Sequence, residues 1–98
     1  MIFLTVAALL SQQIDKFDSR PPAFSATVDR KMEDVERCMI RYGYPPIVYR
    51  QPDRPDQVTI VWTAAGNAAG RVDLSRDGSK TTVKSWLPVK AIRECAGI

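Results

Sequence analysis

The sequence predicts a two-layer α+β fold: an N-terminal amphipathic helix, a four-stranded antiparallel meander and a short C-terminal helix. Three observations lead to this prediction. Apolar residues recur at helical spacing over residues 28–42, strand-like segments alternate on both sides of Asp77-Gly78, and helical spacing returns after Pro88. A chain of 98 residues is long enough for one such domain.

The first helix is expected over residues 28–42. Ser25 or Thr27 can cap its start, and Gly43 is suited to a left-handed end. Its apolar positions are three or four residues apart, with charged residues between them: Val28, Met32, Val35, Cys38, Met39 and Tyr42.

Four strands are expected next, at residues 47–51, 57–64 and 71–76, and from residue 79 to the break at Leu87-Pro88. Prolines fill the turn at 52–56, and the small residues 65–70 predict a loop. Asp77-Gly78 is expected to form a two-residue turn, which fixes the pairing of the strands on either side. The expected pairs are Arg76 with Ser79, Leu74 with Thr81, Asp73 with Thr82, Val72 with Val83 and Arg71 with Lys84.

This alternation gives the predicted sheet two different faces. Val72, Leu74, Val83 and Leu87 point to a core, whereas the other face carries Arg71, Asp73, Thr82, Lys84 and Trp86. Trp62 is expected in the core, on the same side as Val58 and Ile60.

The last helix is expected to begin with Pro88 in its first turn and to end at Gly97. Val89, Ile92, Cys95 and Ala96 share one of its faces. Both cysteines therefore lie on helix faces that pack on one side of the sheet. We expect a disulfide between Cys38 and Cys95; the alternative is two unrelated buried thiols in a cytosolic protein.

The N-terminal segment predicts export. Residues 1–13 are interpreted as a signal peptide or apolar leader, residues 14–24 as a linker and residues 25–98 as the domain. The apolar run over residues 1–10 is too short to span a bilayer, so no transmembrane span is expected. The alternative is an N-terminal strand or helix that belongs to the core.

The composition argues against an enzyme. The chain has no histidine, and the spacing of its two cysteines matches no metal site, so no catalytic residue, metal or cofactor is expected. Acidic pairs such as Glu33 with Glu36 are interpreted as solvated surface charges. The net charge is +3, but acidic and basic residues are interleaved, which makes a nucleic-acid partner unlikely.

The predicted binding surface is the outer sheet face, with Arg71, Lys84 and Trp86 and with Arg50 beside them. Alternatively, basic side chains, Phe17 or Phe24 cover Trp86. The first functional hypothesis is a periplasmic or secreted domain, without enzymatic activity, that binds a protein or an envelope component through this face. The alternative is a cytoplasmic module that binds nucleic acid or another anionic polymer.

Overall fold

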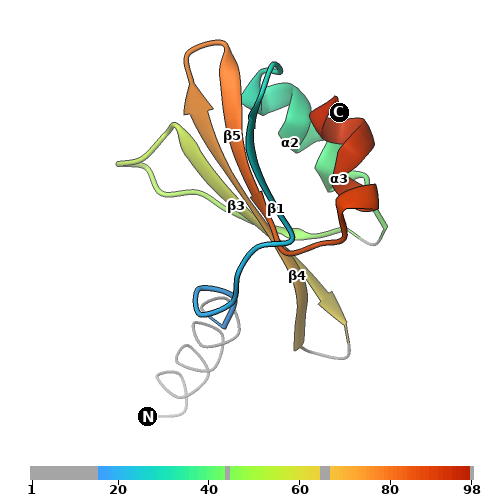
Figure 1. Cartoon of the computed structure of the whole chain (residues 1–98). Helices are drawn as coiled ribbons and strands as arrows, with labels where there is room; N and C mark the ends of the chain where they lie inside the picture. The colour runs from blue at the N-terminus through green and yellow to red at the C-terminus, as the bar shows by residue number, and fades with distance from the viewer. Residues whose placement is uncertain (1–15, 44, 65–66, 98) are drawn as a thin grey trace.

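Five strands form one antiparallel sheet, in the order β1-β5-β4-β3-β2, and two helices pack on one of its faces (Figure 1). The computed structural model describes residues 16–43, 45–64 and 67–97. The strands are β1 (Phe24–Val28), β2 (Ile47–Tyr49), β3 (Gln57–Ala64), β4 (Asn67–Asp77) and β5 (Lys80–Ser85). The helices are α2 (Met32–Ile40) and α3 (Val89–Ala96). The predicted α+β class with an antiparallel sheet is confirmed.

The predicted N-terminal helix was too long, and the predicted number of strands was wrong. Residues expected to cap and begin that helix form β1 instead, which pairs with β5 from Phe24 opposite Ser85 to Val28 opposite Thr81. Helix α2 begins at Met32 without a side-chain cap. The segment Phe24–Val28 alternates apolar and hydroxyl residues, and pairing with the free edge of β5 satisfies its backbone. Local helical spacing cannot reveal such a distant partner.

The hairpin between β4 and β5 has a different register from the predicted one. Asp77 pairs with Lys80, so Gly78 and Ser79 form the loop, and Leu74 lies opposite Val83. Gly78 has a φ of +63°, the left-handed conformation that a tight hairpin loop requires at its first position. Each β4 residue therefore meets a partner two positions further along β5. A shift of two leaves every side chain on its predicted face.

The predicted loop at 65–70 was also too long, because β4 already begins at Asn67. The pairing of β3 with β4 shifts register between Trp62 and Thr63, so this part of the hairpin contains a bulge or irregularity. Backbone hydrogen bonding to β3 outweighs the flexible composition of residues 67–70.

The main core lies between the sheet and the two helices. Val35, Met39, Ile60, Val83 and Ile92 are completely buried there. Trp62 is in this core, as expected, and its Nε1 donates a hydrogen bond to the backbone oxygen of Tyr42 at 2.9 Å.

The predicted disulfide is present and joins α2 to α3 through Cys38 and Cys95. Helix α3 follows Pro88 and ends at Gly97, whose φ is +74°. The two helices are thereby held beside each other on one side of the sheet (Figure 1).

Residues 1–15, which include the predicted signal peptide or leader, lie outside the described residues. In the described part of the chain, no helix is long and apolar enough to cross a membrane.

Candidate functional site

The outer face of the sheet, opposite the helices, carries polar side chains from four strands. Strand alternation brings Tyr49 of β2, Thr59 of β3, Asp73 of β4, and Thr82 and Lys84 of β5 to this face. They line an open hollow of about 560 Å³. Lys84 is exposed at its border.

Arg71 lies in the same hollow but is held by carboxylates. Its Nε and Nη2 donate to the two oxygens of Asp73 at 2.8 and 2.9 Å, and its Nη1 donates to Asp18 at 2.9 Å. Only 12% of its side chain is exposed. Burial lowers the pKa of Arg71, but hydrogen bonds and charge attraction from Asp73 and Asp18 outweigh the effect of burial and raise the pKa above its ordinary value. This guanidinium is a fixed cation with most of its donors engaged.

Trp86 is covered at one end of the face by residues 16–20. Phe17 is 5% exposed and forms a small cluster with Val61, against which Trp86 and Tyr49 pack. The rings of Phe17 and Trp86 are 6.0 Å apart, and the Trp86 Nε1 donates to the backbone oxygen of Arg20 at 3.0 Å. The Arg71 guanidinium carbon is 5.3 Å from the centre of the Trp86 ring.

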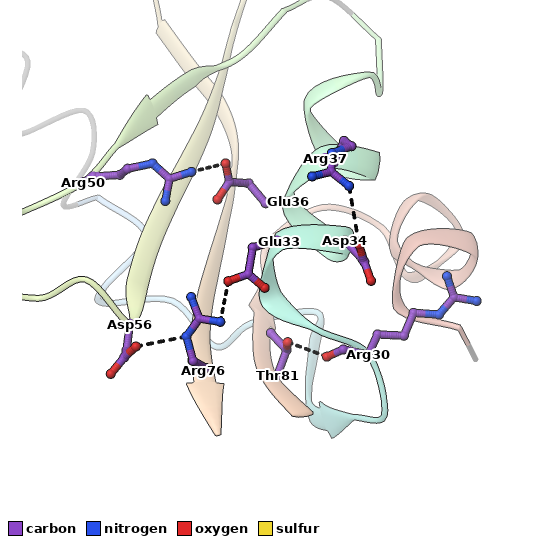
Figure 2. A network of polar contacts seen from close by, with 9 residues as sticks. All are labelled: Arg30, Glu33, Asp34, Glu36, Arg37, Arg50, Asp56, Arg76 and Thr81. Atoms are coloured by element: carbon purple, nitrogen blue, oxygen red, sulfur yellow. Dashed lines mark hydrogen bonds and ion pairs between the residues drawn. The ribbon is translucent and has the colours of Figure 1, made fainter. Parts of the chain in front are cut away.

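Arg50 lies away from this hollow. It follows Tyr49 at the end of β2, and successive strand residues point to opposite faces. Its guanidinium forms an ion pair with Glu36 of α2, on the helical side of the sheet (Figure 2). The structure thus places Arg71, Lys84 and Trp86 on one face, whereas Arg50 points to the other.

Sequence reasoning missed two contributors to this face, Asp18 and Tyr49. Alternation along β2 and β3 could have found Tyr49, because it lies directly opposite Thr59. Asp18 is 53 residues from Arg71, and no sequence pattern connects them. Phe17, rather than Phe24, covers Trp86, since Phe24 packs against the main core.

A second hollow of about 790 Å³ lies between α2 and α3, along the disulfide. Its polar border includes Arg37, which pairs with Asp34 at 3.5 Å while both side chains stay more than half exposed. Exposed pairs of this kind contribute little binding energy or specificity. The outer-face hollow, where partly buried polar groups converge, is the stronger candidate.

No group of three or more carboxylate or cysteine side chains in the described residues could hold a metal ion. Comparison with protein-family models, curated proteins and solved structures gives no match for this chain.

Proposed function

We propose that this chain is a small exported domain, without enzymatic activity, that binds a protein or a cell-envelope component in the hollow on its outer sheet face. The hollow itself is the observation that carries the proposal. Hydroxyl groups of Thr59 and Thr82, the ring of Tyr49 and the charge of Lys84 converge there from three strands. A sheet can present such a set rigidly, which reduces the entropy lost on binding.

The chemistry of the hollow supports binding rather than catalysis. Arg71 is engaged by Asp73 and Asp18, and its raised pKa keeps it protonated. Hydroxyl donors and acceptors beside an aromatic ring and an ammonium group suit a polar ligand such as an extended peptide or a glycan. The disulfide supports export, because such bonds persist mainly in oxidising compartments.

No observation favours an anionic polymer as the ligand. Asp73 and Asp18 neutralise Arg71, and Lys84 lies directly opposite Asp73 in the sheet. The positive charges on this face therefore alternate with negative ones, whereas a polyanion site needs a continuous basic track.

Site-specific photo-crosslinking in the source cells tests the binding site. Lys84 at the hollow and Lys90 on α3 are both exposed, so p-benzoylphenylalanine at each gives a matched pair. We expect a discrete adduct from position 84 and none of that mass from position 90. Thr82→Arg, which fills the hollow, should remove the adduct. Identical adducts from both positions, or none from position 84, would contradict the proposal.

Mass spectrometry of the protein recovered from those cells tests export separately. We expect a mature N-terminus downstream of the apolar run and no free thiol at Cys38 or Cys95. An intact N-terminus with both thiols alkylated before reduction would place the protein in a reducing compartment.

A further inference from the structure

Strand β1 is an edge of the sheet, and within the described residues its only strand neighbour is β5. No backbone hydrogen bond outside the β1-β5 ladder reaches Phe24–Val28 in the described part of the chain. The outer row of N–H and C=O groups is therefore available to another extended strand.

The other edge, β2, is shorter than β1 and has prolines on both sides, whereas Pro21-Pro22 flank β1 on one side only. It has three residues, Pro45-Pro46 precedes it and Pro52 follows shortly after. Short length and nearby prolines are common ways to prevent edge pairing. Strand β1 has five residues with neither charge nor proline, and its register with β5 is unbroken. Of the two edge strands in the described part of the chain, β1 therefore offers the more regular template.

The sequence of β1 is complementary to itself. Phe24-Ser25-Ala26-Thr27-Val28 has the order apolar, hydroxyl, apolar, hydroxyl, apolar, which is the same in both directions. We propose that β1 pairs with β1 of a second copy of this chain, antiparallel and centred on Ala26. Phe24 then lies opposite Val28 of the second copy, and Ser25 opposite its Thr27. An aromatic residue opposite a β-branched residue is a favourable cross-strand pair, and so are two hydroxyl residues opposite each other.

A two-fold axis through Ala26 makes this a closed dimer with one continuous sheet of ten strands, twice the five of one chain. With strands about 4.8 Å apart, the two β5 strands are separated by roughly 14 Å. Helices about 10 Å wide that pack over β4 and β5 fit side by side at this separation.

The interface is small, so the dimer is weak. Five residues a side bury less than the roughly 1,200 Å² of a standard interface. We expect sedimentation equilibrium of the oxidised full-length chain to show a monomer-dimer equilibrium between about 10 μM and 1 mM. A monomer at every concentration in this range overturns the proposal.

Charge substitutions in β1 test the register. Ser25→Glu/Thr27→Glu places like charges opposite each other twice across the two-fold axis and should weaken the dimer about tenfold or more. Ser25→Glu/Thr27→Lys places opposite charges at the same points and should retain the dimer within about threefold of the wild-type affinity. Both variants carry glutamate at position 25, which lies opposite Lys84 of the same chain. This contact within the chain is therefore the same in both variants. Equal dimerisation of the two variants overturns the proposed pairing.

Two controls identify the occupant of the edge. Ile47→Glu/Gln51→Glu adds two glutamates in and just after β2 at the other side of the sheet, and the dimer should persist. Amide hydrogen exchange should slow in β1 as the concentration rises. Protection of β1 that is independent of concentration would mean that the chain's own residues cover the edge, and it would overturn the dimer.

Discussion

Gly70 is a buried residue of β4 at which any side chain would meet Leu87. A Cβ built on Gly70 would lie 2.2 Å from the Leu87 Cδ2, although the backbone here is not left-handed. We expect Gly70→Ala to lower the free energy of unfolding by about 1–3 kcal/mol through overpacking. Urea denaturation measures this loss.

Leu87→Ala provides the matching background for Gly70→Ala. With the leucine side chain truncated, a methyl group at position 70 has room, so the second substitution should cost markedly less. The same cost in both backgrounds would show that the backbone conformation of Gly70, and not the contact, sets the effect.

Glu33 of α2 belongs to an ion-pair network, centred on Arg76 of β4, that links this helix to the sheet (Figure 2). It pairs with Arg76 of β4, and Arg76 Nε donates to Asp56 at 3.0 Å. Two hydrogen bonds lower the pKa of Glu33 below its ordinary value of 4.5. The larger effect comes from the hydrogen bond with its own backbone and the next from the hydrogen bond with Arg76. The carboxylate is therefore more stable in the folded chain than in the unfolded one.

A lowered folded-state pKa means that the contribution of Glu33 is complete above its ordinary pKa of 4.5 and is lost as the pH falls through the lowered value. We expect Glu33→Gln to have a lower free energy of unfolding than the wild type at neutral pH. In urea titrations, the free energies of the two proteins should approach each other below pH 4.5. Glu94→Gln removes an exposed carboxylate from α3 and should have little effect at either pH. A constant difference for Glu33→Gln at all pH values would contradict the linkage.

At the scale of elements, the disulfide is the strongest single constraint on the helical layer. It joins residues 57 apart, and closing a loop of that size stabilises by about 4 kcal/mol in the chain-entropy model. We expect Cys38→Ala/Cys95→Ala to lower the free energy of unfolding by about 2–4 kcal/mol in guanidinium titrations.

Reductant is the control for this substitution. It should destabilise the wild type by a similar amount and leave the double variant unchanged. A wild type whose unfolding is the same with and without reductant would show that the bond contributes nothing.

The elements differ in how far local sequence predicts them. Helix α3 and its Gly97 end follow from spacing and a cap residue, which act within a few positions. Strand β1 depends on β5, about 55 residues away, and the same alternating residues were mistaken for a helix start. The β4-β5 register depended on which two residues form the loop, and Gly78 occupies the first loop position rather than the second.

At the scale of the whole molecule, the described residues form one core on each face of the sheet. The smaller one joins Phe17 to Val61, with Trp86 packed against it. We expect Phe17→Ala to cost about 1.5–3 kcal/mol, the value of one buried large side chain. It should also shift the fluorescence of Trp86 to the red as that ring becomes hydrated.

A Trp62→Phe background makes Trp86 the only emitting tryptophan, since the chain has two. Phe17→Leu keeps an apolar contact and should leave the emission nearly unchanged. Emission from Trp86 that stays the same in Phe17→Ala would mean that residues 16–20 do not shield its ring.

The sequence by itself determined the α+β class, the C-terminal helix, the core positions of the strands and the pairing of Cys38 with Cys95. Those features depend on periodicity and on residue chemistry, which are properties of short segments. Only the tertiary structure decided that residues 24–28 are a strand, that Arg50 turns to α2, and that Asp18 holds Arg71. Each of these depends on contacts between distant segments, whose free energy exists only once the whole sheet has formed.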